Sequence, residues 1–416
     1  MNNVQSRSLS HGARLVVEPI DGVRSAAMCW MVPGGSAHDP PDQLGRSSVW
    51  QELLMRGAGG RASRDMADAI DRLGVGRSVD VGTFYVRVGA TMLGDRLLDT
   101  LTLVTDMVLA PALADEDFAP AVDLALQSIA SLADNPHERC AIEARRRHMP
   151  DPINRSGLGT PEGIARLTPA GLRRDWAATA RPGGSILAIA GAADADAIAD
   201  TLERLLASWE GSTPLPDRGP PPPRGYAHET DQTNQVQVIV CHDAPPEPHG
   251  DSILEKIVLS VLSGGMSGRL FTEVREKRGL CYSVSAGYRG DRDFGSVTAY
   301  VGTTPERAQE SLRVLMAELR RISDPAPENR ISPDEFQRAV AGMKSRLVFS
   351  GESTAARASA LAADLHVHGR PRTLREIADT IDRVTLDQVN DYLGRRTLGT
   401  LTIQTLGPDP LDAGGL

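Results

Sequence analysis

The feature that most constrains the fold is a proline-rich segment near the middle of the 416-residue chain. Residues 211–225 read GSTPLPDRGPPPPRG, and the consecutive prolines at 220–223 favour an extended polyproline II conformation. Such a segment acts as a semi-rigid spacer. It leaves about 200 residues on either side, an ordinary size for a domain. We therefore predict two domains, residues 1–213 and 226–416, joined by a linker at residues 214–225.

The two halves repeat one order of predicted elements. Each half opens with segments rich in β-branched residues, continues with a helix and a pair of strands, and ends with a helix that runs into a strand. The opening strands are Ala13–Pro19, Ser25–Pro33 and Asn234–His242, the strand pairs lie at residues 78–91 and 282–301, and the closing segments lie at residues 165–190 and 381–405. A repeat of about 200 residues in this order predicts two related α+β domains.

Helix starts in the second half carry clear signals. Ser252 and Glu255 have the spacing of a capping box, as do Ser332 and Glu335. Thr304 is a cap residue followed by a proline and an acid, which also favours a helix start. We expect helices to begin at all three places.

Composition excludes several classes of protein. Hydrophobic residues make up 41% and charged residues 24%, and the net charge is -9, which disfavours nucleic acid as a partner. No window approaches 18 uninterrupted apolar residues, so no membrane span is expected. The four cysteines are far apart and form no C-x-x-C pair. With no apolar run near the N-terminus, a cytoplasmic protein is expected.

The most specific stretch is residues 264–286, GGMSGRLFTEVREKRGLCYSVSA. Its apolar spacing predicts a helix over Met266–Lys277, which Gly279 ends before a strand begins at Tyr282. A tight helix-to-strand turn of this kind can bring Arg275 and Tyr282 to the same edge. On the residues alone, the favoured interpretation is that Arg275 is an exposed helix residue and that Tyr282 packs at a strand start.

This segment resembles the second domain of the pitrilysin/insulinase metallopeptidases, especially the mitochondrial-processing-peptidase branch and its bacterial relatives. The family pattern there is close to SRLFQEVREKRGLAYSV. The resemblance implies that each half of the chain is a mostly antiparallel sheet packed with helices, together forming one half of a clamshell. It also implies that Arg275 holds the backbone of a peptide substrate and that Tyr282 donates a hydrogen bond to the developing oxyanion.

The zinc site of that family is missing. In the family, His-x-x-Glu-His on an early helix and a later Glu hold zinc. The matching helix reads SVWQELLMRGAGG, which places Ser48 and Glu52 at the histidine positions and Gln51 at the position of the general base. Ser128 falls near the distal ligand, and the sequence has no histidine between His38 and His137. We expect no metal in this chain, because one carboxylate makes no tetrahedral site and an amide accepts no proton.

Other candidate groups carry less weight. His366 and His368 form the densest histidine pair, and they could share a metal only on a strand. Residues 241–243 read Cys-His-Asp, but neighbours on a strand point to opposite sides and cannot form a relay. Cys281 is expected to be a small buried hydrophobe. The glycines at 264–268 lack the lysine of a phosphate-binding loop.

Taken with the resemblance, these residues predict a non-catalytic subunit of a heterodimeric zinc peptidase that shapes the chamber and contacts substrate. Zinc is then expected only in a partner of similar size, and a homodimer is the alternative assembly. A structural or binding protein with the same fold and no role in proteolysis is the alternative function. An active peptidase with an unrecognised site is a third. The substrate class is peptide, with no nucleic acid or membrane as partner.

Overall fold

The computed structural model describes residues 4–324 and 326–414, which form two compact units. Unit 1 comprises Met1–Ser131, Asp151–Pro220 and Ser350–Thr373. Unit 2 comprises Leu132–Pro150, Pro221–Phe349 and Leu374–Leu416. The main division between the units, at Pro220 and Pro221, therefore lies inside the proline-rich segment, and shorter segments of each half belong to the opposite unit.

Unit 1 is built on a six-stranded sheet in the order β1-β2-β6-β3-β5-β4. The β2–β6 pair is parallel, whereas the pairs β1–β2, β3–β6, β3–β5 and β4–β5 are antiparallel. The central strand β3 reads SAAMCWMVP and is buried along nearly its whole length, as expected of a strand covered on both faces. The strands are β1 (Gln5–Ser8), β2 (Arg14–Pro19), β3 (Ser25–Pro33), β4 (Gly76–Val81), β5 (Tyr85–Leu93) and β6 (Ile186–Gly191).

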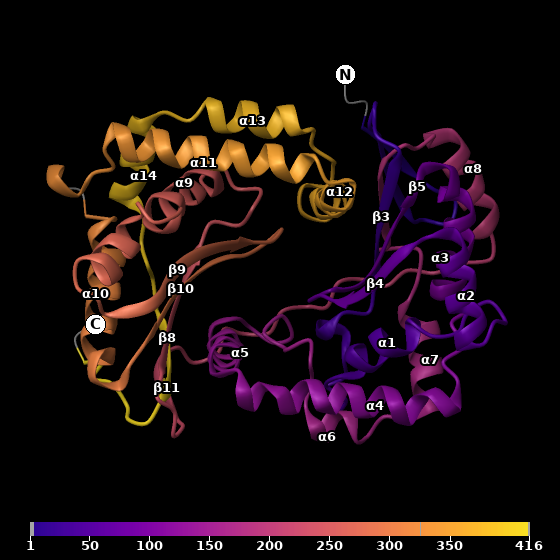
Figure 1. Cartoon of the computed structure of the whole chain (residues 1–416), viewed down its shortest axis with the longest axis horizontal. Helices are drawn as coiled ribbons and strands as arrows, with labels where there is room; N and C mark the ends of the chain where they lie inside the picture. Colours follow the sequence, from indigo (N-terminus) through magenta and orange to yellow (C-terminus); the bar gives the residue numbers. More distant parts are fainter. Residues whose placement is uncertain (1–3, 325, 415–416) are drawn as a thin grey trace. The chain divides into compact units, whose positions relative to one another are not determined.

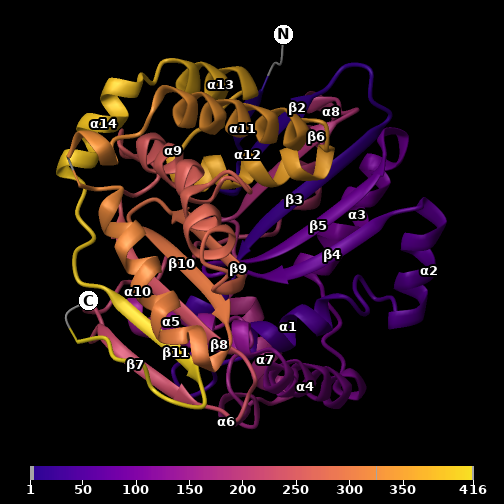
Figure 2. The ribbon, with the colours of Figure 1, turned by 60° about the vertical axis from the view of Figure 1, so that its left-hand side comes forward.

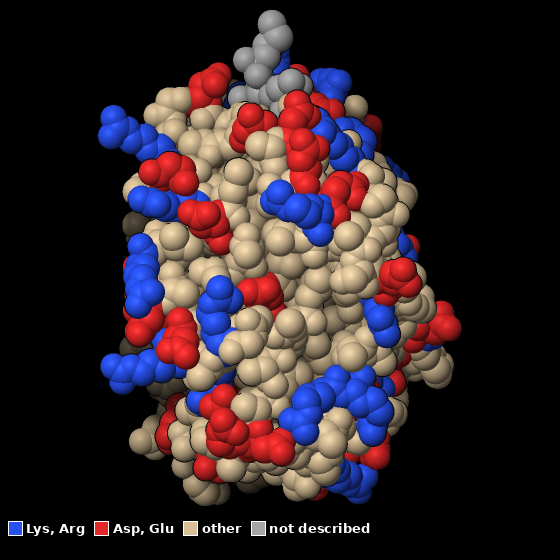
Figure 3. Space-filling view, turned by 90° about the vertical axis from the view of Figure 1, so that its right-hand side faces the viewer, with Lys and Arg blue, Asp and Glu red and all other residues tan. Residues whose placement is uncertain are grey.

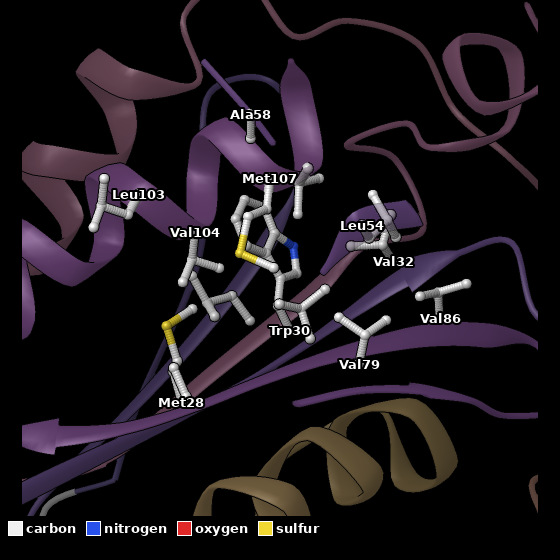
Figure 4. Packing of buried hydrophobic residues seen from close by; sticks show 14 of the residues in the cluster. Met28, Trp30, Val32, Leu54, Ala58, Val79, Val86, Leu103, Val104 and Met107 are labelled. Atoms are coloured by element: carbon white, nitrogen blue, oxygen red, sulfur yellow. The ribbon is translucent and has the colours of Figure 1, made fainter. Parts of the chain in front are cut away.

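Helices pack on one face of this sheet, and the main hydrophobic core of unit 1 lies between them and the sheet. Met28, Trp30 and Val32 of β3 pack there against Val104 and Met107 of the helix α3 (Figure 4). The helices of unit 1 include η1 (Ser36–His38), α1 (Arg46–Leu54), α2 (Ser63–Leu73), η2 (Gly94–Arg96), α3 (Leu97–Leu109), α4 (Asp115–Ala130), α6 (Pro161–Ile164), α7 (Pro169–Thr179), α8 (Ala195–Leu205) and α12 (Thr354–His368), and η3 (Ser131–Asp134) lies at the unit boundary.

The helix α12 packs against β3 and β6 of unit 1, although it comes from the second half of the sequence (Figures 1 and 2). A buried ion pair fixes it there. The guanidinium of Arg357 on α12 donates to the carboxylate of Glu18 on β2, and the two side chains are 1% and 0% exposed. Arg357 also donates to the carbonyl oxygen of Arg372 at 2.6 Å.

Unit 2 is built on a five-stranded sheet in the order β7-β11-β8-β10-β9 (Figure 2). The β7–β11 pair is parallel, and the pairs β8–β11, β8–β10 and β9–β10 are antiparallel. The strands are β7 (Gly225–Thr230), β8 (Val236–Ala244), β9 (Cys281–Gly290), β10 (Gly295–Thr303) and β11 (Thr402–Gly407). Strand β9 is an edge strand, because β10 is its one neighbour within the described sheet.

The helix α5 packs against β8 and β11 of unit 2, although it comes from the first half of the sequence. Its residue Arg147 donates to the carbonyl oxygens of Ile403 at 3.2 Å and Gly225 at 3.0 Å. The helices of unit 2 include α5 (Pro136–His148), α9 (Ser252–Ser263), η4 (Phe271–Glu276), α10 (Pro305–Arg321), η5 (Pro327–Asn329), α13 (Leu374–Asp382) and α14 (Leu386–Arg395), and α11 (Pro333–Gly351) ends at the unit boundary.

The two sheets share one topology. Reading each from its parallel pair, β2-β6-β3-β5-β4 of unit 1 corresponds to β7-β11-β8-β10-β9 of unit 2. The order of elements along the chain matches as well, and it gives α5 and α12 the same place in the two repeats. The two halves of the chain therefore exchange equivalent helices: α5 of the first half packs in unit 2, and α12 of the second half packs in unit 1. The predicted α+β class is confirmed, with two mostly antiparallel sheets packed with helices.

Helices begin at all three predicted places, since α9 starts at Ser252, α10 at Pro305 directly after Thr304, and α11 at Pro333. Ser332 and Glu335 form the expected reciprocal cap of α11, with the Ser332 backbone N–H donating to the Glu335 carboxylate at 2.9 Å. The capping box expected at Ser252 is wrong. Glu255 is 1% exposed and accepts from Tyr392 of α14 and from Arg396, which follows that helix, so tertiary partners take the carboxylate that a box would need.

On the face drawn in Figure 3, positively and negatively charged side chains are interspersed. Among the described helices, none combines the length and the apolar character that crossing a bilayer requires.

Candidate functional site

The residues predicted to occupy the positions of the zinc motif, Ser48, Gln51 and Glu52, lie on α1. Ser48 is 9% exposed, and Gln51 and Glu52 are half-buried. The helix packs against α4 within unit 1, and α4 carries Ser128, whose hydroxyl donates to the Leu124 carbonyl oxygen at 3.0 Å. Among residues 4–324 and 326–414, His, Cys, Asp and Glu form no group of three that could hold a metal ion. The chemistry of these four side chains does not fit a tetrahedral zinc site.

A polar cluster at the N-terminus of α1 gives this helix its position. The carboxylate of Asp39 accepts from the backbone N–H groups of Gly45 and Ser47, each at 3.0 Å, and from the Ser47 hydroxyl at 3.0 Å. Arg46 lies 3.7 Å from the same carboxylate and stacks 4.4 Å from the ring of Trp50. Burial raises the pKa of Asp39 to about 6. The sequence does not reveal this cluster, because no motif marks Asp39, seven residues before Arg46, as a cap of α1.

The Arg/Tyr segment is wound more widely than the sequence predicts. The helix expected over Met266–Lys277 is confirmed in part: it begins later, at Arg269, and it is a π-helix, η4, over Phe271–Glu276. Gly265 has φ +152°, outside helical space, and a Cβ on Gly268 would lie 2.8 Å from the Leu262 carbonyl oxygen. These glycines delay the helix, and π-helical turns of this kind are frequent at functional sites.

The turn from η4 into β9 is closed by short hydrogen bonds. The backbone N–H of Gly279 donates to the Arg275 carbonyl oxygen at 3.0 Å, and that of Leu280 donates to the Val274 carbonyl oxygen at 3.0 Å. Gly279 has φ +60°, the left-handed conformation that favours glycine at a helix C-terminus. This confirms Gly279 as the helix stop, and it fixes the backbone on which both candidate side chains stand.

Arg275 and Tyr282 are both exposed on unit 2. Tyr282, near the start of β9, is 72% exposed, so it does not pack in the core. The guanidinium of Arg275 lies 5.0 Å from the ring centroid of Phe271, a cation–π distance that restricts its rotamers. Burial raises the pKa of the Cys281 thiol, and the positive charge of Arg275 offsets part of this rise. The structure thus brings Arg275 close to the residue that precedes Tyr282.

The remaining sequence candidates have structural roles. The Nδ1 atom of His366 is 3.0 Å from the hydroxyl of Tyr85, and both His366 and His368 lie in the last turn of α12. Cys241, His242 and Asp243 lie in β8, as expected of a strand. Cys281 is half-buried rather than fully buried.

Two buried histidines in unit 2 are held neutral. The Nδ1–H of His242 donates to the Asp243 carbonyl oxygen at 2.8 Å, and its Nε2 accepts from Arg396 at 3.1 Å, which leaves no room for a second proton. Burial, with the Arg396 charge, lowers the pKa of His242 to about 4. Burial, with the Arg224 charge, lowers the pKa of His148 to about 4 as well.

Unit 2 is therefore expected to lose stability as the pH falls from 6.5 toward 4. Since the unfolded histidines titrate near 6.5, the unfolded state binds more protons throughout this window, and the stabilisation present above pH 6.5 is lost. His148 and His242 should each lower the free energy of unfolding by on the order of 2 kcal/mol at pH 5. In unit 1, His38 acts in the same direction, since its pKa is lowered to about 4, but Asp39 acts oppositely.

Urea unfolding at pH 7 and pH 5 checks this expectation with two signals. All four tryptophans belong to unit 1, so their fluorescence reports that unit, whereas far-UV circular dichroism reports both. The circular-dichroism transition should broaden or split at pH 5 while the fluorescence midpoint moves less. Equal shifts in the two signals would contradict the assignment to unit 2.

The chain resembles known proteins both in sequence and in structure. A family described as the peptidase M16 inactive domain matches residues 176–343, which include Arg275 and Tyr282. A protein named uncharacterized zinc protease from Streptomyces coelicolor is 28% identical, with 98% of this chain and 90% of the relative covered. The chain is similar to the pitrilysin-type M16 peptidases. A zinc protease of the same description from Bacillus subtilis is 26% identical over 93% of this chain and 94% of its own.

Solved structures show the same fold. A peptidase M16 inactive domain from Pseudomonas fluorescens superposes with a TM-score of 0.87 and 19% identity, and covers 99% of both chains. A protease from Helicobacter pylori superposes with a TM-score of 0.85 and 15% identity, over 98% of this chain and 100% of the other. These findings confirm the resemblance to the pitrilysin type.

Proposed function

We propose that this chain is the non-catalytic subunit of a two-chain zinc peptidase. The partner supplies the zinc and the general base, and this chain shapes the chamber and contacts the peptide substrate through Arg275 and Tyr282. The partner is a zinc-bearing chain of similar size, with a second copy of this chain as the alternative. The pair acts in the cytoplasm, the location expected from the sequence.

The observation that carries the proposal is the contrast between two segments of one chain. On α1, Ser48, Gln51 and Glu52 have side chains that do not fit a zinc site. On unit 2, Arg275 and Tyr282 are exposed at a turn whose backbone is fixed by hydrogen bonds. An exposed tyrosine on an edge strand contributes little to folding, whereas it is well placed to contact a peptide.

The first experiment is gentle purification of the tagged chain from its own host, followed by mass spectrometry of stoichiometric partners. A partner of similar length that carries His-x-x-Glu-His is the expected result, and the purified pair should cleave peptides in a chelator-sensitive way. Recovery of a homodimer, or of partners that are not peptidases, would favour the alternative of a structural or binding protein with this fold.

The isolated chain is expected to bind less than ~0.1 zinc per molecule and to show no chelator-sensitive cleavage, because a single carboxylate is a poor zinc site. Metal analysis after dialysis against zinc, together with a peptide-cleavage assay, checks this. A matched measurement on the purified pair should give one zinc per pair. Stoichiometric zinc in the isolated chain would show that it has a metal site of its own.

A further inference from the structure

Unit 2 contains a partly enclosed cavity of about 160 Å³ between α5 and the strands β8 to β10. Two guanidinium groups line it, Arg145 from α5 and Arg289 from β9. The cavity wall also includes apolar surface from Met149 and Phe294 and the hydroxyl groups of Ser296 and Thr298. The exchanged helix α5 thus supplies one of the two cations.

The two arginines repel one another inside this wall. Arg145 is largely buried, and burial together with the Arg289 charge lowers its pKa to about 10, so it still carries its charge at neutral pH. Two like charges in a partly desolvated space are unfavourable. Both residues also have interactions within the chain, but a guanidinium has five N–H donors in a fixed fork and can serve more than one acceptor. An anion placed between them would relieve the repulsion.

The size and lining of the cavity restrict the anion. A cavity of about 150 Å³ lined by apolar side chains holds a benzene ring. A carboxylate is planar and accepts bidentate hydrogen bonds from arginine, which suits the two guanidinium groups. The apolar wall at Met149 and Phe294 suits the body that carries the carboxylate. One amino-acid side chain, or the last residue of a peptide, has these dimensions.

We propose that this cavity binds a carboxylate of a peptide, with Arg145 and Arg289 as its cationic partners. The carboxylate comes either from an acidic side chain or from the C-terminus of the peptide, since both have the same chemistry. The site deepens the proposed function, because it would make this subunit a selector of peptides by their negative charge. It is distinct from the turn that carries Arg275 and Tyr282.

The test is isothermal titration of the isolated chain with N-acetylated tetrapeptides that differ in their carboxylates. One has a free C-terminal acid on phenylalanine, one is its C-terminal amide, and one is an amide with glutamate as its last residue. The acid or the glutamate peptide should bind at least ~10-fold more tightly than the uncharged amide, as expected of a charge-assisted hydrogen bond. Which of the two binds identifies the source of the carboxylate.

Variants show whether the cavity is the site. Arg289→Gln should weaken binding of the charged peptide ~10-fold or more, and Arg145→Gln should do the same if that variant still folds. Because Arg289 is exposed on an edge strand, its variant keeps the test valid if Arg145→Gln is unstable. The matched control is Arg292→Gln, an exposed arginine at the β9–β10 turn that pairs with Asp293.

Equal binding of the charged peptides and the uncharged amide would overturn the proposal, as would unchanged affinity in the Arg289→Gln variant. Inorganic phosphate that binds as tightly as the charged peptides would overturn the assignment to carboxylates. The titration needs no partner chain. A failure to find a zinc-bearing partner therefore leaves the result intact, and a failure of the titration leaves the two-chain peptidase untouched.

Discussion

Replacing Arg357 with methionine is expected to lower the free energy of unfolding of unit 1 by about 3–5 kcal/mol. The change leaves the Glu18 carboxylate, which is 0% exposed, without the guanidinium that donates to it. It also removes the donor to the Arg372 carbonyl oxygen at 2.6 Å. A buried carboxylate that loses its cation keeps its desolvation penalty, and this sets the size of the effect.

Tryptophan fluorescence during urea unfolding is the measurement, because the four tryptophans lie in unit 1. Arg64→Met is the control, since Arg64 is exposed on α2 of the same unit and should change the free energy of unfolding by less than about 0.5 kcal/mol. The double variant Glu18→Leu with Arg357→Met should recover most of the loss, because an apolar pair needs no compensating charge. A single variant within 1 kcal/mol of the parent would show that the ion pair does not hold α12 on β2.

The helix exchange is the part of the fold that sequence reasoning could not reach. The sequence supplies a cap at Ser353 and a left-handed glycine at Gly369, which define α12 as a helix. Neither signal specifies which sheet the helix covers. That choice is made by contacts between distant residues, Glu18 with Arg357 and Cys140 with the backbone of β8 and β11, and no local pattern encodes them. The repeat of one order of elements along the chain, in contrast, is readable from the sequence, because strand and helix patterns are local.

The candidate site divides in the same way. The missing histidines of α1 are readable from the sequence, because a zinc motif is a local pattern at fixed helical spacing. The position of Gly279 is also readable, since a glycine stop acts through its own backbone. The π-helical winding at Phe271–Glu276 is not, because the apolar spacing of a helix does not distinguish an i→i+5 hydrogen-bond pattern from an i→i+4 pattern. The basic cavity at Arg145 and Arg289 needs the exchanged helix and was equally out of reach.

In the purified pair, Tyr282→Phe is expected to lower kcat by about 10²-fold with little change in KM, and Arg275→Ala to raise KM by about 10-fold. The phenol would donate to an oxyanion that exists only in the transition state, so its loss changes the chemical step. The guanidinium would hold the peptide backbone in ground state and transition state alike, so its loss changes binding. Steady-state kinetics on the reconstituted pair separates the two.

Lys277→Ala is the matched control for Arg275→Ala, because Lys277 is an exposed cation at the C-terminal end of η4. Its partner Glu273 keeps Arg278 at 2.7 Å, so the turn should stay intact. Both active-site variants should co-purify with the partner in normal yield, since Tyr282 and Arg275 are exposed and contribute little to folding. If turnover of the pair is unchanged in both, the exposed Arg/Tyr turn takes no part in catalysis. The chain would then serve the pair only by shaping the space in which the partner works.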